Sequence, residues 1–178
     1  MKFYKVSWKE LEKDSFELAK KLKNHKFDRI LCISRGGLVW ARMFSDLLNL
    51  PVSHLTVTSY QHLKQQKETK ITETPKDLKN QHFLVIDEIV DTGKTLQVVI
   101  DYLKAQKITN FKTLAPIVRT FSKPLPYYYL KVINDWVIFP YETRETVGAF
   151  LKLFKSKEKT RKKLLEVGFE KWQINEIL

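Results

Sequence analysis

The chain has 178 residues, a hydrophobic content of 43% and a formal net charge of +12. This length predicts one main domain, and the hydrophobic content is ordinary for a globular protein. The single cysteine, Cys32, excludes a disulfide framework and is expected in the core. The N-terminal residues lack the apolar stretch of a signal peptide and no apolar run is long enough to span a membrane, so we expect a cytoplasmic protein.

The predicted elements alternate between helices and strands. Ser7 and Glu10 form a capping box, which predicts a helix that ends near Asn24. Apolar runs and turn residues then predict, in chain order, a strand over about 29–34, a helix over about 37–48, strands over about 52–59 and 83–86, a helix beginning near 96, and strands over 111–118 and 127–133. This alternation predicts a central parallel sheet with helices on both faces, and a ligand site outside the carboxyl ends of its strands.

Two segments depart from this pattern. Residues 61–80 are polar and rich in lysine, which predicts a solvated loop, and since long loops of this kind often cover binding sites we expect a lid. Residues 152–163 carry seven basic side chains and one acid, and a mainly apolar set returns from Leu164 to Leu178. We therefore predict a basic helix, a break at Gly168 and a short final helix. They form a C-terminal extension over 150–178, after a main domain over 1–149.

Residues 83–96 carry the strongest indication of chemistry. An apolar strand is followed by three acids, Asp87, Glu88 and Asp91, and then by a Thr-Gly-Lys-Thr turn that opens a helix. The N–H groups and positive dipole end of a helix N-terminus suit a phosphate, and acids beside it suit sugar hydroxyls or hydrated Mg²⁺. A nucleotide-binding P-loop is excluded, because it requires glycine where Glu88 stands. An ordinary surface turn does not explain three acids at one strand end, so we predict a site for a phosphorylated sugar.

This stretch, FLVIDEIVDTGKTL, resembles the phosphoribosyl pyrophosphate (PRPP) motif of the type I phosphoribosyltransferases. ISRGG at 33–37 is similar to the pyrophosphate loop of the 6-oxopurine members, especially the bacterial and archaeal xanthine-guanine enzymes. Ser59-Tyr60 is similar to the start of their mobile catalytic loop, and WVIFPYE at 136–142 is similar to their purine-binding segment. The resemblance implies the family's α/β fold, a central parallel sheet flanked by helices with a small hood region. The C-terminal extension lies outside the resemblance.

The resemblance also implies an activity. The 5-phosphoribosyl group of PRPP is transferred to guanine, xanthine or hypoxanthine with release of pyrophosphate, as a reaction of purine salvage. Asp91 is the implied general acid or base at the purine N7. Mg²⁺ is the implied cofactor, with Asp87, Glu88 and Glu142 as its implied contacts. The implied PRPP-binding residues lie in the pyrophosphate loop and the acid-rich stretch: Arg35, Gly36, Asp87, Glu88, Asp91, Thr92, Gly93, Lys94 and Thr95.

The implied base-binding residues are Arg119, Trp136 and Val137. Trp136 offers a flat face for a purine, and Val137 offers backbone groups to the edge of the base. Enzymes for 6-oxopurines usually place a lysine at the end of the preceding strand, whereas this chain has Arg119 there, with Lys123 as the second candidate. Arginine only donates hydrogen bonds, so it fits an oxo group and disfavours an amino group.

Two alternatives remain open. One is a phosphoribosyltransferase for another base such as adenine, against which Ser59-Tyr60 and Arg119 argue. The other is a PRPP-sensing regulator that binds nucleic acid on the same fold, and the charge of +12 gives it weight. The lysines are nevertheless spread along the chain, a polyanionic substrate also needs positive potential, and Asp91 with a lysine-rich lid favours an enzyme. We expect nucleotide and pyrophosphate as products, a homo-oligomer, and no nucleic-acid or membrane partner.

Overall fold

The computed structural model describes residues 2–62, 65–76 and 78–178, and it describes side chains in these ranges except at 59–68. The chain forms two compact units. The larger unit comprises Glu12–Asn134, and the smaller unit comprises Met1–Leu11 together with Asp135–Leu178. Within the described ranges, no helix combines the length and the apolar character needed to cross a membrane.

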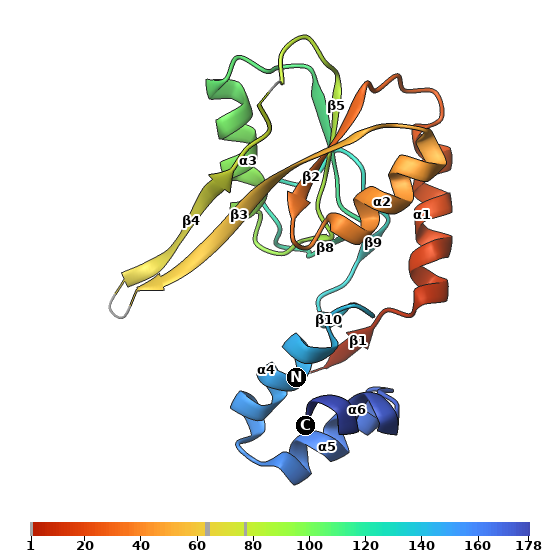
Figure 1. Ribbon diagram of the computed structural model, residues 1–178, viewed down its shortest axis with the longest axis vertical. Helices are drawn as coiled ribbons and strands as arrows, with labels where there is room; N and C mark the ends of the chain where they lie inside the picture. The colour runs from red at the N-terminus through yellow and green to blue at the C-terminus, as the bar shows by residue number, and fades with distance from the viewer. Residues whose placement is uncertain (1, 63–64, 77) are drawn as a thin grey trace. The chain divides into compact units, whose positions relative to one another are not determined.

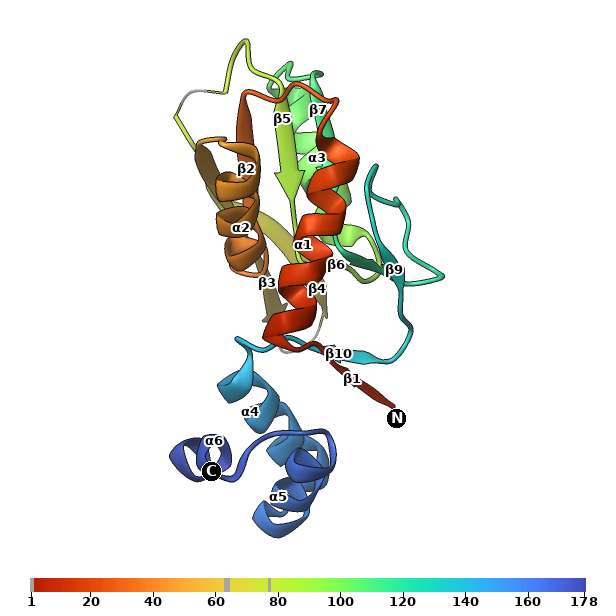
Figure 2. The same ribbon diagram turned by 90° about the vertical axis from the view of Figure 1, so that its right-hand side faces the viewer.

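A five-stranded sheet forms the centre of the larger unit, with helices on both of its sides (Figures 1 and 2). Four of its strands are parallel and stand in the order β3 (Val52–His62), β2 (Arg29–Ser34), β5 (Phe83–Ile86) and β7 (Phe111–Leu114). Helix α3 (Lys94–Ala105) lies on one side of the sheet, and α1 (Trp8–Leu22) and α2 (Leu38–Leu48) lie on the other. The predicted parallel sheet flanked by helices is therefore confirmed.

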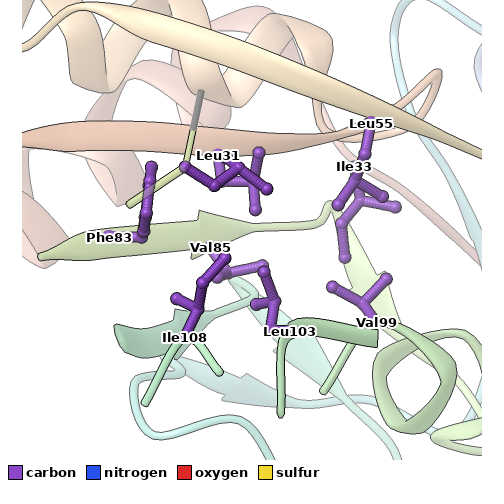
Figure 3. Packing of buried hydrophobic residues seen from close by; sticks show 9 residues of the cluster. Leu31, Ile33, Leu55, Phe83, Val85, Val99, Leu103 and Ile108 are labelled. Carbon is purple, nitrogen blue, oxygen red and sulfur yellow. The ribbon is translucent and has the colours of Figure 1, made fainter. Parts of the chain in front are cut away.

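Both faces of β2 and β5 are covered, which explains why their sequences are nearly continuous apolar runs. Five of the six residues of β2 and all four residues of β5 are buried. Ile33 of β2 and Val85 of β5 pack in one cluster with Val99 and Leu103 of α3 (Figure 3). Cys32 points to the opposite face by strand alternation and is a buried free thiol, as predicted. Burial raises the pKa of this thiol to about 12, so it is unreactive at neutral pH.

The loop predicted over residues 61–80 is wrong for most of its length. Strand β3 continues to His62, and β4 (Gln65–Glu73) pairs with it in an antiparallel ladder at the edge of the sheet. An edge strand obtains its ladder hydrogen bonds from the backbone, so polar side chains do not prevent it from forming. The polar composition of this segment therefore indicated exposure to water and not the absence of a strand.

A three-stranded parallel sheet also belongs to the larger unit. It consists of β6 (Ile89–Val90), β8 (Ile117–Val118) and β9 (Lys131–Val132). The single strands predicted over 111–118 and 127–133 are therefore wrong in extent. Pro116 lacks an N–H group and separates β7 from β8, and its carbonyl accepts hydrogen bonds from the backbone of Leu130 and Lys131. Strand β7, before Pro116, belongs to the five-stranded sheet, and β8, after it, belongs to the three-stranded sheet.

The smaller unit combines a two-stranded sheet with three helices. Its elements are β1 (Phe3–Lys5), paired in parallel with β10 (Trp136–Ile138), and the helices α4 (Thr143–Phe154), α5 (Lys157–Glu166) and α6 (Lys171–Ile177). Ile138, Phe150 and Leu164 belong to its core. The domain boundary predicted between residues 149 and 150 falls inside α4, because the apolar face of this helix continues past that point.

Two serine caps define where helices begin. The backbone N–H of Glu10 donates to the hydroxyl of Ser7 at 3.1 Å, which confirms the predicted cap of α1. The hydroxyl of Ser156 caps α5 in the same way, directly after Lys155 adopts a left-handed conformation with φ 50°. The basic segment therefore contains the end of α4 and a separate α5 where one helix was predicted. The predicted break at Gly168, with φ 90°, and the short final helix are confirmed.

Candidate active site

A cleft of about 460 Å³ opens at the carboxyl ends of β2 and β5 in the larger unit. Its walls come from the loops after these two strands, from the turn before α3 and, through Val57 and Thr69, from the β3–β4 hairpin. Segments that are far apart in the sequence thus share one cleft, at the edge of the sheet where folds of this kind bind ligands. Thr69 is not among the predicted site residues, because only strand pairing brings it to this wall.

The predicted acid pair lies in this cleft, directly after β5. The backbone N–H of Asp87 donates to the carbonyl of Leu114 at 3.0 Å, which ties the pair to β7. The backbone N–H of Glu88 donates to a carboxylate oxygen of Asp87 at 2.8 Å. Burial raises the pKa of Asp87 from 3.8 to about 7, and this hydrogen bond offsets part of the rise. The Asp87 carboxyl is therefore only partly ionised at neutral pH. A ligand that supplies positive charge or hydroxyl donors would favour its ionised form.

The Gly-Gly pair of the ISRGG loop lets this loop approach the acid pair. A Cβ at Gly36 would lie 2.5 Å from a carboxylate oxygen of Glu88, and a Cβ at Gly37 would lie 2.6 Å from the carbonyl oxygen of Ile86. A side chain at Gly37 would therefore meet backbone, and one at Gly36 would displace the Glu88 side chain. Gly37 is not among the predicted site residues, although its place beside Gly36 in the sequence was a usable signal. Arg35 of the same loop is exposed and lines the cleft.

The Thr-Gly-Lys-Thr turn closes the opposite wall of the cleft. Gly93 has φ 93°, a conformation that favours glycine, and immediately precedes α3. A Cβ there would lie 2.0 Å from the carbonyl oxygen of Lys123, whose backbone N–H donates to the carbonyl of Thr92 at 3.1 Å. The backbone N–H of Lys94 lies 3.4 Å from the hydroxyl of Thr92. The turn is thus held between α3 and the 119–124 loop, with the exposed side chains of Thr92 and Lys94 at the cleft.

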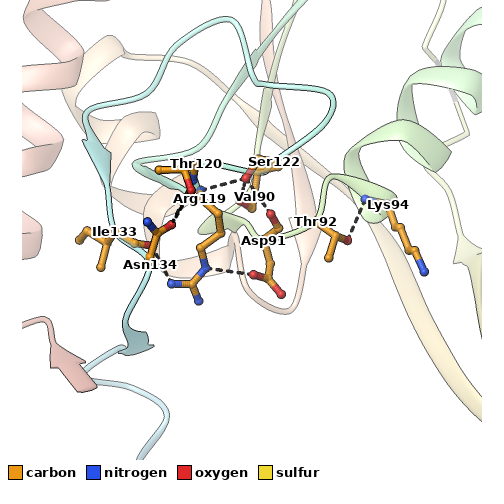
Figure 4. Close-up of polar contacts among 9 residues, drawn as sticks. All are labelled: Val90, Asp91, Thr92, Lys94, Arg119, Thr120, Ser122, Ile133 and Asn134. Atoms are coloured by element: carbon orange, nitrogen blue, oxygen red, sulfur yellow. Dashed lines mark hydrogen bonds and ion pairs between the residues drawn. The ribbon is translucent and has the colours of Figure 1, made fainter. Parts of the chain in front are cut away.

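Asp91 and Arg119 form an ion pair beside this turn (Figure 4). The Nε of Arg119 donates to Oδ1 of Asp91 at 2.9 Å, and its Nη1 donates to the carbonyl of Ile133 at 2.7 Å. The backbone N–H of Arg119 donates to the Ser122 hydroxyl, which lies 2.7 Å from the carbonyl oxygen of Asp91. Sequence reasoning missed both the ion pair and Ser122, because neither contact leaves a local signal.

The remaining predicted residues lie elsewhere or are described only in part. Trp136, 45% exposed, and Val137, buried, stand in β10 of the smaller unit. Glu142 belongs to the same unit, where its carboxylate accepts a hydrogen bond from the backbone of Phe139 at 3.0 Å. Ser59 and Tyr60 belong to β3, and their side chains lie outside the described residues. The structure therefore brings the PRPP residues and Arg119 together in one unit, and Trp136, Val137 and Glu142 in the other.

Asp87 and Glu88 are the residues of the cleft that fit a metal. Both offer carboxylate oxygens, the donors that Mg²⁺ prefers. Across the part of the chain that the structure describes, no cluster of three or more His, Cys, Asp and Glu side chains could hold a metal ion by itself. Mg²⁺ usually keeps several waters and is bound through one or two carboxylates plus substrate phosphates. The pair therefore fits a Mg²⁺ ion that arrives with a phosphorylated substrate.

A parallel α/β sheet whose strand ends carry an acid pair, a Gly-Gly loop and a helix-opening turn defines an α/β enzyme for a phosphorylated substrate. The model of the phosphoribosyl transferase domain family matches residues 7–145 of this chain. The chain belongs to this family, and it is a transferase of the phosphoribosyltransferase class. The matched residues end within the first turn of α4, so the rest of the helical extension lies outside the family model.

Relatives of known structure and name agree with this assignment. The chain is 30% identical to a xanthine-guanine phosphoribosyltransferase of Idiomarina loihiensis over 149 residues, which is 77% of this chain and 85% of that protein. It is similar to the purine phosphoribosyltransferase of Pyrococcus horikoshii, with a TM-score of 0.72 and 30% identity over 79% of this chain and 95% of that one. For the Helicobacter pylori xanthine-guanine-hypoxanthine phosphoribosyltransferase, the TM-score is 0.71 and the identity 26%, over 79% and 94%. The predicted family and its fold are confirmed.

Proposed function

We propose that this protein transfers the 5-phosphoribosyl group of PRPP to guanine, xanthine or hypoxanthine and releases pyrophosphate, as a step of purine salvage. The observation that carries the proposal is the shared cleft, in which an acid pair, a Gly-Gly loop and a helix-opening turn surround about 460 Å³. The names of the Idiomarina, Pyrococcus and Helicobacter relatives support a purine as the acceptor.

Each wall of the cleft suits one part of PRPP. The carboxylates of Asp87 and Glu88 accept hydrogen bonds from the 2′- and 3′-hydroxyls of the ribose. The turn formed by Thr92, Gly93, Lys94 and Thr95 offers backbone N–H groups and hydroxyls to the 5′-phosphate at the start of α3. Arg35, exposed at the rim, offers a planar set of donors to the pyrophosphate, and Gly36 lets the backbone approach it. Charge on the leaving pyrophosphate is thereby neutralised where it develops.

Mg²⁺ is the proposed cofactor, held through Asp87 and Glu88, and it supplies positive charge to the pyrophosphate when bound. Removal of divalent cations by a chelator is expected to stop turnover, and added Mg²⁺ should restore it. Glu142, the other predicted contact, already accepts a hydrogen bond from Phe139, so its part in metal binding stays a prediction.

The purine is the second substrate. Trp136 and Val137 remain the proposed residues for its face and edge, and Asp91 is the proposed base that removes the proton from N7. The sequence offered Arg119 and Lys123 as cationic donors for the 6-oxo group. Because the Arg119 side chain already pairs with Asp91, Lys123 is the proposed donor. A phosphorylated sugar substrate also supports a cytoplasmic site of action, because PRPP does not cross membranes unaided. A homo-oligomer stays a prediction, which exposed apolar side chains of the larger unit, among them Phe121, Leu125, Tyr127 and Val132, support.

Turnover with a panel of free bases tests the proposal. The intact chain is incubated with PRPP, Mg²⁺ and one of guanine, xanthine, hypoxanthine or adenine, and nucleotide formation is followed by chromatography. We expect good use of at least one 6-oxopurine and poor use of adenine. Preferred use of adenine would contradict the proposed substrate class. Tight binding of nucleic acid without turnover of any base would contradict the proposed activity.

A further inference from the structure

The carboxylate proposed as the base at N7 is poorly held by its own surroundings. Asp91 lines the cleft, and its side chain is 62% exposed. An exposed aspartate on a loop can adopt several rotamers, whereas a base must stand within hydrogen-bond distance of the proton that it removes. The side chain that restricts Asp91 is therefore of functional interest.

Arg119 is well suited to restrict it. Its side chain is only 12% exposed, and it lies between Asp91 on one side and the carbonyl of Ile133 on the other. Its backbone is held by the hydroxyl of Ser122, which also contacts the carbonyl oxygen of Asp91. The carbonyl of Ile133 therefore holds the Arg119 guanidinium, and Ser122 holds the Arg119 backbone, in addition to the contact with Asp91. Its planar shape also fixes the direction from which Oδ1 is approached.

We infer that Arg119 is a positioning residue that acts through Asp91 and not through direct contact with the purine. The inference rests on the proposed function. Arg119 holds Oδ1, which leaves Oδ2 as the oxygen that takes the proton from N7. In that step N9 forms the bond to C1′, the bond between C1′ and pyrophosphate breaks with its electron pair on pyrophosphate, and the electrons of the N7–H bond enter the imidazole ring. Because N7 is common to all purines, loss of Arg119 should affect every purine alike.

The test is a double-mutant cycle with Arg119→Met, Asp91→Asn and the double variant. We expect Arg119→Met to lower kcat with guanine about 10–100-fold, the range for a misplaced catalytic group, and to leave the KM for PRPP within about twofold. When Asp91 is already replaced by Asn, adding Arg119→Met should lower kcat by less than about a further twofold, because its effect requires the carboxylate. Arg119→Lys should recover part of the activity. Arg42→Met, which removes an exposed Arg–Asp contact of 3.8 Å, is the matched control and should leave kcat unchanged.

Two results would overturn the inference. Additive losses in the double variant would mean that Arg119 acts independently of Asp91. A loss much larger for hypoxanthine than for adenine would assign Arg119 to the 6-oxo group itself. If Arg119→Met melts well below the intact chain, the cycle is run with Arg119→Gln, which also removes the charge, and is judged by the same criteria. Failure of the intact chain to use any purine would instead refute the proposed function and, with it, this inference.

Discussion

The cleft of the larger unit and the helices of the smaller unit differ in how far their charged side chains are exposed to water. In the cleft, desolvation raises the pKa of the Asp87 carboxyl to about 7, a Cβ at Gly93 would meet the backbone of Lys123, and a Cβ at Gly36 would displace the Glu88 side chain. In the helical unit, Phe150 and Leu164 are buried while the basic side chains of α5 other than Lys163 are exposed. The first arrangement costs stability and prepares a site, and the second stabilises the fold. Substitutions in the two regions should therefore separate activity from stability.

The largest effect is expected from the acid pair. Replacing Asp87 by Asn and Glu88 by Gln removes two carboxylates from the proposed ribose and Mg²⁺ contacts, and should lower kcat/KM for PRPP by about 10³-fold or more. The thermal midpoint should not fall, since these groups stand at the end of a strand and desolvation already disfavours the ionised form of Asp87. Steady-state kinetics and thermal unfolding check both parts. Unchanged kcat/KM in the folded double variant would remove the PRPP assignment.

The next effect is a dependence of stability on pH. The folded-state pKa of Asp87, about 7, lies above its ordinary value of 3.8. The contribution of this group is therefore fully present below about pH 4 and is lost as the pH rises towards 7, by a total on the order of 4 kcal/mol. Asp87→Asn should gain stability relative to the intact chain over this window. Urea unfolding between pH 4.5 and 8 measures it, and parallel curves for the two proteins would contradict the raised pKa.

A comparable loss of stability without loss of activity is expected in the helical unit. Phe150 is 1% exposed and packs against Phe3 and Phe154, with ring centroids 4.8 and 5.6 Å away. Phe150→Ala should lower the free energy of unfolding by about 3 kcal/mol through lost burial and a cavity. Leu153→Ala, at an exposed position of the same helix, is the control and should have little effect. A lower kcat for Phe150→Ala, at a temperature where the variant stays folded, would contradict this separation and show that the core around Phe150 supports the proposed purine-binding residues of β10.

The smallest effect is expected from the basic face of α5. Lys157, Lys159 and Lys162 are exposed, and replacing all three by Gln should change stability by less than about 0.5 kcal/mol and kcat by less than about twofold. Solvated lysines of this kind contribute little to a fold. If the intact chain binds RNA in a salt-dependent way and this variant does not, the exposed lysines of α5 instead form a nucleic-acid surface.

Local sequence pattern was sufficient to predict those parts of the fold and the site whose residues are contiguous in the sequence. The strand, the acids and the helix-opening turn of 83–96 follow one another directly, so their order in the sequence is also their order in space. The same holds for the capping residue Ser7 and for the break at Gly168. Pattern failed for the 61–80 segment, because an edge strand pairs through its backbone and its side chains are free to be polar. It also failed at Pro116, where a missing N–H group divides one expected strand into β7 and β8.

The alternation of strands and helices, the burial of β2 and β5 and the family of the chain could all be predicted from the amino-acid sequence. Only the tertiary structure decided that Gly36 abuts Glu88, that Gly93 abuts the backbone of Lys123 and that Arg119 is paired with Asp91. The physical reason is that periodicity and turn chemistry act between near neighbours. Contacts between loops depend on which strands lie side by side, and the pairing of β2 with β5 and of β6 with β8 brings these loops to one edge of the fold.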